Sequence, residues 1–376
     1  MKVERFVDRM KVIGIKTFVG IPDSTLKEFC DYLNKNEAQE FEHFVPANEG
    51  AAVGLGAGIY LGTGNPVCVY LQNSGIGNAL NPIISLLNRE VYDIPMLFVV
   101  GWRGEPGTKD EPQHVFQGKI THELFHILGI ETRTISSETG ERELDEIFQS
   151  AKLALEMNKQ FALIVKKDTF TVDKIGVYNN SNVILREEAI ERILHHVTST
   201  DMIVSTTGKI SREVYEQSDK ILGDHKQNFL TVGSMGHAIM IAMGLAITNV
   251  DKQIICFDGD GAAFMHMGAI AYVGQNKAKN LIHIILNNGA HESVGGMPTG
   301  VGEMQFAPIA RQCGYEEIFV VNTLDELDVI LKKLRSLSKL TLIEINVGIG
   351  SRKNLGRPIE TPTDNKINFM KYHGVK

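Results

Sequence analysis

The second half of the chain contains a carboxylate and an amide, each directly after an apolar run. Asp260 stands in a Gly-Asp-Gly sequence, and Asn288, 28 positions later (288 − 260), stands in Asn-Asn-Gly-Ala. Their oxygens, together with a backbone carbonyl, suit a hard cation such as Mg²⁺, which keeps some of its waters and bridges phosphate oxygens. The two glycines beside Asp260 let backbone N–H groups approach a diphosphate closely. These residues therefore predict a metal and diphosphate site.

One strand–helix–strand unit must position these two groups. The apolar runs 254–257 and 281–286 predict buried parallel strands, and the mostly small and apolar residues 264–275 predict a helix packed on the sheet. A right-handed crossover brings the carboxyl ends of both strands to the same edge of the sheet. Taken alone, a Gly-Asp-Gly sequence is most often a tight turn after a strand. The amide pair after a second strand reverses that preference.

The rest of the chain alternates apolar and helical segments in the same way. Buried strands are also predicted at 17–20, 67–71, 96–100, 161–165, 202–206 and 340–347. Helices are predicted at 50–62 and 187–197, and the polar stretch within 171–186 predicts a linker. We therefore expect an α/β protein of two doubly wound parallel-sheet domains, with boundaries 1–178 and 179–376.

The bulk composition excludes several classes of protein. The 376 residues are 43% hydrophobic and 22% charged, with a net charge of −7, which argues against a nucleic-acid partner. No apolar run is long enough to span a membrane, and the N-terminus lacks the apolar core of a signal peptide. The four cysteines are scattered and form no CxxC motif, which favours reduced thiols in a cytoplasmic protein.

The combination of Gly-Asp-Gly and the distant asparagine pair resembles the signature of the thiamin diphosphate enzymes. This resemblance implies thiamin diphosphate and Mg²⁺ as cofactors. It implies that Asp260, Asn288 and the carbonyl of Ala290 bind the metal, and that the amides of Gly261 and Ala262 bind the diphosphate. The resemblance also implies a pyrimidine-binding domain at 1–178 and a diphosphate-binding domain at 179–376.

Glu49 matches a second feature of these enzymes. It lies between a short strand and a helix rich in glycine and alanine, where the pyrimidine-binding domain of the family carries a glutamate. The resemblance implies that its carboxylate bonds to the aminopyrimidine ring and helps the C2 proton to leave, which is general acid–base catalysis. Without the motifs of the second half, Glu49 would be only an acid that favours a helix N-terminus.

A third feature is the Gly-Ser-Met-Gly sequence at 233–236. In the family, a bulky apolar residue between such glycines bends the cofactor, which implies this role for Met235. The carbonyl of Gly233 would accept from the 4′-amino group, with Ser234 beside it, and Gly208 is expected near the diphosphate. The alternative is a strand–helix turn with a core methionine.

Over its whole length the chain is similar to the phosphonopyruvate decarboxylases. The stretches that carry the similarity are 20–27, 72–78, 101–114 and 350–358. The resemblance implies a carboxy-lyase that converts 3-phosphonopyruvate to phosphonoacetaldehyde and CO₂ in phosphonate biosynthesis. The alternatives are a sulfopyruvate decarboxylase, a carboligase or transferase on 2-oxo acids, and a non-catalytic subunit. A dinucleotide-binding dehydrogenase is disfavoured because no GxGxxG follows a strand.

A small anionic 2-oxo acid requires cations and proton donors in its pocket. The loop 101–114 contains Arg103, which suits forked phosphonate contacts, and His114, a candidate proton donor. Lys109 in the same loop either binds substrate or is a solvated surface charge. Asp23, after the first strand, is either a proton relay or a helix cap.

Three further residues complete the candidate site. His291 and Glu292 follow the metal loop directly, so we expect His291 to bind substrate and Glu292 to act in catalysis, with the order of proton transfers left open. Arg352 either completes the phosphonate site or belongs to a C-terminal tail. The resemblance also implies a homodimer or homotetramer, with the cofactor between the first domain of one subunit and the second domain of another.

Overall fold

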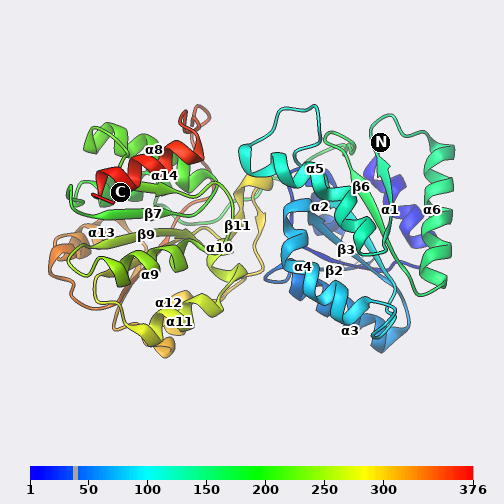
Figure 1. The fold of residues 1–376 in the computed structure, drawn as a ribbon, viewed down its shortest axis with the longest axis horizontal. Helices are drawn as coiled ribbons and strands as arrows, with labels where there is room; N and C mark the ends of the chain where they lie inside the picture. The colour runs from blue at the N-terminus through cyan, green and yellow to red at the C-terminus, as the bar shows by residue number, and fades with distance from the viewer. Residues whose placement is uncertain (37–40, 376) are drawn as a thin grey trace. The chain divides into compact units, whose positions relative to one another are not determined.

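The computed structural model describes residues 1–36 and 41–375, which form two compact units divided between Val177 and Tyr178 (Figure 1). Each unit contains one six-stranded sheet, with the orders β2-β1-β3-β4-β6-β5 and β13-β14-β10-β9-β7-β8. Neighbouring strands in both sheets are parallel. If the strands of each sheet are numbered 1 to 6 in chain order, both sheets have the order 2-1-3-4-6-5, read from β2 in the first sheet and from β8 in the second. The two units therefore have the same sheet topology. The predicted pair of doubly wound α/β folds is confirmed.

The first unit alternates helices and strands along the chain. Its elements are α1 (Val3–Val12), β1 (Thr17–Gly20), α2 (Lys27–Asn36), β2 (Glu42–Phe44), α3 (Glu49–Thr63), β3 (Val67–Gln72), η1 (Asn73–Gly75), α4 (Ile76–Pro82), η2 (Ile83–Leu87), β4 (Met96–Gly101), α5 (Pro112–Ile127), β5 (Glu131–Ile135), α6 (Glu141–Glu156) and β6 (Gln160–Val165).

The second unit repeats this alternation and adds a short ribbon. Its elements are α7 (Arg186–Leu194), β7 (Met202–Ser205), α8 (Lys209–Leu222), β8 (Asn228–Leu230), α9 (Ala238–Thr248), β9 (Ile254–Gly259), α10 (Asp260–Met265), α11 (Gly268–Asn276), β10 (Leu281–Asn287), β11 (Ala290–His291), η3 (Glu292–Val294), β12 (Met297–Pro298), α12 (Phe306–Cys313), β13 (Glu317–Val321), α13 (Leu324–Leu331), η4 (Leu334–Ser336), β14 (Thr341–Asn346) and α14 (Pro362–Tyr372).

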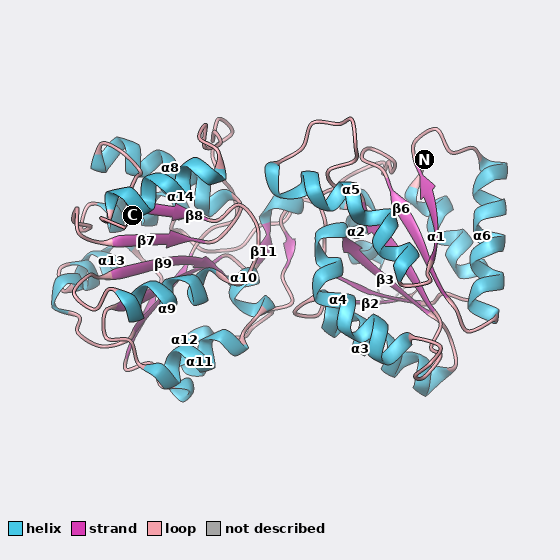
Figure 2. Cartoon of the chain, viewed as in Figure 1, coloured by secondary structure: helices cyan, strands magenta, loops and turns pink. Residues whose placement is uncertain are grey.

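Apolar side chains cover both faces of each sheet, and Figure 2 shows helices on either side of the strands. In the first unit, α3, α4 and α5 pack on one face, while an aromatic cluster of Phe6, Phe29, Phe148 and Phe170 fills the other. Burying each such ring stabilises the fold by about 1.5–3 kcal/mol. The central strands are consequently buried along nearly their whole length, as parallel strands must be.

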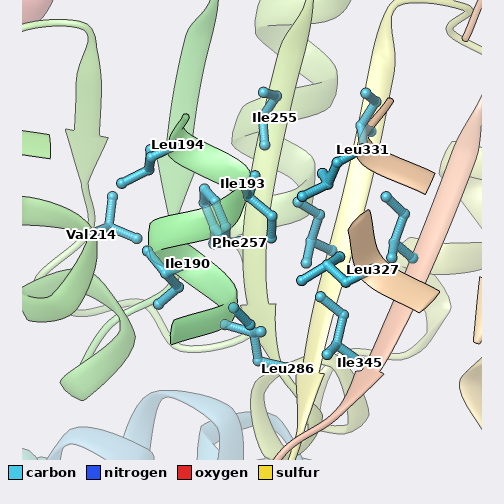
Figure 3. Packing of buried hydrophobic residues seen from close by; sticks show 14 of the residues in the cluster. Ile190, Ile193, Leu194, Val214, Ile255, Phe257, Leu286, Leu327, Leu331 and Ile345 are labelled. Atoms are coloured by element: carbon cyan, nitrogen blue, oxygen red, sulfur yellow. The ribbon is translucent and has the colours of Figure 1, made fainter. Parts of the chain in front are cut away.

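The second unit is built in the same way. Side chains of α7, α8 and α13 meet β9, β10 and β14 on one face, as Figure 3 shows for Ile190, Val214, Phe257 and Leu327. Helices α9, α11, α12 and α14 cover the opposite face. Both faces of β9 and β10 are thus buried under apolar side chains. The two strands end directly before Asp260 and Asn288, the predicted metal ligands.

Three details differ from the sequence-based expectations. The helix predicted at 264–275 is two helices, α10 and α11, which are separated at 266–267. The edge strands β5, β8 and β13 were not predicted. In β5 and β13 exposed residues interrupt the apolar run, and β8 has only three residues, one of which is the buried polar Asn228. The predicted linker region is held to the second unit by hydrogen bonds: the side-chain amide of Asn180 donates to the carbonyls of Asn288 at 2.9 Å and Val347 at 3.0 Å.

Across residues 1–36 and 41–375, no helix combines the length and the apolar character that a membrane crossing requires.

Candidate active site

The strand order of each sheet identifies where a ligand can bind. In both sheets the order reverses beside the first strand, with β1 between β2 and β3 and β7 between β8 and β9. Doubly wound folds bind ligands beyond the carboxyl ends of the strands at this point. Asp23 and Glu49 follow β1 and β2, while Asp260 and Asn288 follow β9 and β10. The predicted residues of each unit therefore lie at the ligand-binding edge of its own sheet.

Glu49 is the first residue of α3 and only 5% exposed. The helix begins there because the Asn48 side chain accepts from the Ala51 N–H at 2.9 Å, a standard N-cap. Asn78 Nδ2 donates to Glu49 Oε2 at 2.7 Å. Burial raises the pKa of the Glu49 carboxyl above its usual value, although the Asn78 bond opposes the shift. A buried carboxyl whose pKa is raised holds a proton more readily than an exposed glutamate does.

Gly75 provides the space that the Glu49 side chain occupies. A Cβ at position 75 would lie 2.2 Å from Glu49 Oε1, which is far inside contact distance. We expect Gly75→Ala to displace the carboxyl and lower the turnover rate about 100-fold, because small misplacements of a catalytic group cost this much. Gly77→Ala is the matched control, since a Cβ at Gly77 meets no atom within 4 Å.

Rates of CO₂ release and thermal unfolding curves of the two variants would check this prediction. Equal activity of the Gly75 and Gly77 variants would show that the position of Glu49 does not matter.

Asp23 is buried next to the end of β4. Its Oδ2 accepts from the Thr25 N–H at 2.9 Å, and its Oδ1 accepts from the Gln72 side chain. A Cβ at Gly101 would lie 2.1 Å from Oδ2, so glycine is needed there. Burial raises the pKa of Asp23, while the Arg103 charge and the hydrogen bonds oppose the shift. The carboxylate caps a local turn, and its role as a proton relay stays a prediction.

Arg103 lies close to Asp23 but bonds to other groups. Its Nε donates to Asp110 Oδ2 at 2.8 Å, its Nη2 donates to Asp110 Oδ1, and its Nη1 donates to Ser24 Oγ at 2.9 Å. Asp110 therefore neutralises and orients the guanidinium by a forked pair. A substrate anion would therefore approach an arginine that is held in place and whose Nε and Nη2 already donate to Asp110.

His114 and Lys109 differ in their surroundings. His114 is buried and its Nδ1 has no hydrogen-bond partner among the described residues. Burial, assisted by the Arg103 charge, lowers the pKa of His114 to about 4, so the imidazole is neutral at neutral pH. Lys109 is exposed on the loop between β4 and α5. The structure thus brings Asp23, Arg103 and His114 together and leaves Lys109 at the surface.

In the second unit, Asp260 is 3% exposed and contacts the asparagine loop directly. Its carboxylate accepts from Thr299 Oγ1 at 2.9 Å and from the backbone N–H of Asn288. Burial raises the pKa of Asp260 to about 6. No ion pair to this carboxylate is found within the described part of the chain. A buried carboxylate without a cation is costly, so the position calls for one.

The other predicted metal ligands adjoin Asp260. Asn288 Oδ1 accepts from the Ala290 N–H at 3.0 Å, and the β11–β12 ribbon pairs Ala290 with Pro298, next to Thr299. The residues available are one carboxylate, one amide oxygen and backbone carbonyls. Among residues 1–36 and 41–375, no cluster of three His, Cys, Asp or Glu forms an all-protein metal cage. This donor set fits Mg²⁺ that shares its coordination with phosphate oxygens.

The Gly-Ser-Met-Gly loop lies against α10. A Cβ at Gly261 would lie 3.6 Å from Met235 Cε and 3.7 Å from His291 Cε1, so both side chains lie beside this glycine. A Cβ at Gly236 would lie 2.9 Å from the carbonyl of Ala262. Burial lowers the pKa of His291 to about 4. Met235 and His291 therefore border the Gly-Asp-Gly segment.

Two backbone positions in this region have unusual conformations. Ser234 has φ +52°, which is uncommon outside glycine and typical of functional segments. Gly208 has φ +95°, and no atom lies within 4 Å of the position its Cβ would take, which leaves its backbone open to a ligand. Gly233 lies in the same loop as Ser234, between β8 and α9.

Comparison with known proteins agrees with this geometry. Residues 2–125 match the model for the thiamine pyrophosphate enzyme N-terminal TPP binding domain, and residues 220–345 match the C-terminal TPP binding domain. The phosphonopyruvate decarboxylase of Streptomyces viridochromogenes is 32% identical over 371 residues, covering 94% of this chain and 90% of that protein. The chain belongs to the phosphonopyruvate decarboxylase family.

Two further relatives are also similar to this chain over nearly its whole length. The phosphonopyruvate decarboxylase of Streptomyces hygroscopicus is 31% identical over 377 residues, covering 96% of this chain and 91% of that protein. The sulfopyruvate decarboxylase of Methanosarcina acetivorans is 26% identical over 366 residues, covering 91% and 90%. The two matched TPP binding domains support thiamin diphosphate as the cofactor.

Two predicted residues of this family member are bound by other side chains. Glu292 pairs with Arg186 and with Lys209 Nζ at 3.2 Å, and its Oε2 accepts from Asn288 Nδ2 at 3.2 Å. Arg352 pairs with Glu187 at 2.8 Å and with Glu216. Arg352 therefore lies among acids on α7 and α8, which already pair with its guanidinium. The catalytic role of Glu292 and the substrate role of Arg352 stay predictions.

Several supporting residues were missed at the sequence level. They are Asn78, Asp110, Arg186, Glu213 and Thr299. Their partners are mostly distant in sequence: Arg186 and Glu292 are 106 positions apart, and Thr299 and Asp260 are 39 apart. No local pattern marks such a pair. Asn78 and Asp110 carried a signal, because they lie in the 72–78 and 101–114 stretches that resemble the family.

Proposed function

We propose that the protein decarboxylates 3-phosphonopyruvate to phosphonoacetaldehyde and CO₂ in phosphonate biosynthesis, with thiamin diphosphate and Mg²⁺. The observation that carries the proposal is the similarity to a phosphonopyruvate decarboxylase over 94% of this chain. The buried carboxyls of Glu49 and Asp260 support it, because each would have a defined task in such an enzyme.

The second unit would hold the diphosphate end of the cofactor. Asp260, Asn288 and the carbonyl of Ala290 would bind Mg²⁺, since they are adjacent oxygen donors with one negative charge. The amides of Gly261 and Ala262 open α10 and would donate to the diphosphate. Gly208, Gly233, Ser234 and Met235 would border the cofactor. When bound, thiamin diphosphate supplies the electron sink that lets CO₂ leave a 2-oxo acid.

The first unit would supply the groups that move protons. Glu49 would bond to the aminopyrimidine ring and hold a proton there, since burial has already raised its pKa. The neutral imidazole of His114 would donate or accept a proton at its unpaired Nδ1, and Asp23 would relay it. Arg103 would attract the substrate anion, with Lys109, His291 and Arg352 as further candidates and Glu292 as a further catalytic group.

A sulfopyruvate decarboxylase is the second candidate, because a relative of that name aligns over 91% of the chain. CO₂ release from 3-phosphonopyruvate, sulfopyruvate and pyruvate, each with and without thiamin diphosphate and Mg²⁺, separates the candidates. Preference for phosphonopyruvate that depends on cofactor is expected. Preference for sulfopyruvate would make sulfopyruvate the substrate and leave the assignment of the site unchanged. No CO₂ release from any of the three substrates would refute the decarboxylase proposal.

A homodimer or homotetramer with the cofactor at a subunit interface is also proposed. Helix α3 exposes Ala51, Gly54, Leu55, Gly58, Leu61 and Gly62. A Cβ at Gly54, Gly58 or Gly62 would meet no atom of this chain within 4 Å. Three glycines in a helix lower its stability, by roughly 1 kcal/mol each relative to alanine, without a packing reason inside the unit. Close approach of a second subunit would provide that reason.

Gly58→Arg is expected to shift the protein toward monomers, because a long cation would occupy the exposed glycine face. Light scattering after size-exclusion chromatography measures the mass, and calorimetry measures thiamin diphosphate binding, which should fall with the oligomer. Gln149→Arg, on the exposed face of α6, is the control and should change neither. An unchanged mass for the Gly58 variant would remove α3 from the interface.

A cytoplasmic location completes the proposal. It is supported by the four free cysteines, three of which are buried as thiols that form no disulfide.

A further inference from the structure

A buried chain of ion pairs runs from α8 through α7 to the metal loop. Arg186 Nε donates to Glu213 Oε2 at 2.6 Å, and its Nη2 donates to Glu213 Oε1 at 2.7 Å. Its Nη1 donates to Glu292 Oε2. Arg186 is 4% exposed and Glu213 is 0% exposed. One guanidinium therefore joins two carboxylates that come from distant parts of the chain.

This chain of contacts ends on a proposed metal ligand. Glu292 Oε2 also accepts from Asn288 Nδ2 at 3.2 Å. An ionised carboxylate only accepts hydrogen bonds, so the amide nitrogen of Asn288 must face it and the amide oxygen must face away. That oxygen accepts from the Ala290 N–H and keeps a second lone pair. Glu292 and the Ala290 N–H thus both hold the Asn288 amide in the orientation whose oxygen faces away from Glu292.

We propose that Arg186 is a positioning residue for the cofactor metal: it holds Glu292, and Glu292 orients the Asn288 amide with its oxygen toward Mg²⁺. The inference rests on the proposed function, because it takes Asn288 as a ligand of Mg²⁺ bound with thiamin diphosphate. Among the described residues, the Arg186 side chain bonds to Glu213 and Glu292 and to none of the proposed metal ligands, so its effect on the metal would pass through Glu292.

The location of Arg186 supports a role beyond joining two helices. It is the first residue of α7, where the helix dipole disfavours a cation, and α7 carries Glu187 and Glu188 in the same turn. A link between α7 and α8 needs only the Glu213 pair. The third guanidinium nitrogen, Nη1, bonds to Glu292 at the start of η3, directly after the loop that contains the proposed metal ligands. Lys209, at 30% side-chain exposure, also contacts Glu292, but with a single flexible donor.

The test is the Mg²⁺ dependence of thiamin diphosphate binding, measured by calorimetry on the full-length protein at a series of Mg²⁺ concentrations. Arg186→Met combined with Glu213→Leu removes the guanidinium without leaving its main partner charged and buried. We expect this variant to need about tenfold more Mg²⁺ for half-saturation, since removing the outer partners of metal ligands has effects of this size. Saturating Mg²⁺ should then restore most of kcat.

Two further variants make the test robust. Glu292→Gln removes the charge that orients Asn288 while Arg186 keeps its Glu213 pair, so it should fold and show the same increase. Arg192→Met is the matched control: Arg192 lies on the same helix, and the ion pairs found for it among the described residues are with Glu188 and Asp328, not with the loop 287–290. Its half-saturating Mg²⁺ concentration should equal that of the wild type.

The outcomes are distinct. If the wild type binds thiamin diphosphate with Mg²⁺ and both test variants need no more Mg²⁺ than it does, the positioning role is overturned and the proposed function stands. A lower melting temperature of the unliganded double variant with an unchanged Mg²⁺ requirement would show that the ion pair serves only the fold. Binding by the wild type that ignores Mg²⁺ would overturn the metal site and this inference together.

Discussion

Glu49→Gln is expected to abolish CO₂ release while thiamin diphosphate stays bound. Glutamine keeps the length of the side chain and an oxygen that can accept from Asn78, so the local structure should persist. It cannot exchange a proton as a carboxyl does. A loss of about 10²–10⁴-fold in turnover is expected for a missing general acid–base group. Substrate turnover and calorimetric cofactor binding, measured on the same preparation, check both parts of the prediction.

Glu143→Gln is the control for this change. Glu143 is the third residue of α6 and is exposed, so it lies in the first turn of its helix, as Glu49 does, but without the burial. Its variant should match the wild type. Full activity of the Glu49 variant would remove this carboxyl from the chemistry, and simultaneous loss of cofactor binding would make it a binding residue instead.

Asp260→Asn is expected to remove Mg²⁺-dependent cofactor binding. Asparagine retains the shape and an acceptor for Thr299, but it lacks the one negative charge of the donor set. Affinity for Mg²⁺ with thiamin diphosphate should fall more than about 100-fold, because even the partners of metal ligands contribute up to this factor. The wild type should gain about 2.7 kcal/mol of stability at a ligand concentration 100 times its Kd, and the variant should gain less than about 0.4 kcal/mol at the same concentration.

Thermal unfolding with and without cofactor and Mg²⁺ measures this gain. The unliganded variant should be no less stable than the unliganded wild type, because the replaced carboxylate is buried without a cation partner among the described residues. Asp325→Asn, in the exposed first turn of α13, is the control and should keep the full gain. An undiminished gain for the Asp260 variant would exclude it from the metal site.

Much of the fold could be predicted from the sequence because the central strands are buried on both faces. Strands such as β4 and β10 read as continuous apolar runs, and their predicted limits agree with the structure to within a residue or two. The edge strand β5 has the sequence Glu-Thr-Arg-Thr-Ile, and it forms only because β6 offers a row of backbone partners. Such a strand depends on its neighbour more than on its own residues.

The candidate site divides in a similar way. Residues that follow a strand directly, such as Asp23, Asp260 and Asn288, were predictable because strand ends gather at one edge of a parallel sheet. In the sequence, Arg103 was the favoured anion-binding arginine, and Arg352 was left open between the phosphonate site and a C-terminal tail. The structure adds their partners: Arg103 lies beside Asp23 and is held by Asp110, while Arg352 is held by acids of α7 and α8.

The sequence by itself therefore determined the class of fold, the family and the residues at the strand ends, because apolar periodicity and short motifs are local properties of the chain. The tertiary structure alone decided which side chains orient and neutralise them: Asn78 on Glu49, Thr299 on Asp260, and Arg186 with Glu292 on Asn288. These contacts join residues that are distant in sequence, and hydrogen bonds and ion pairs of this kind exist only after the sheets have brought their partners within about 3 Å of each other.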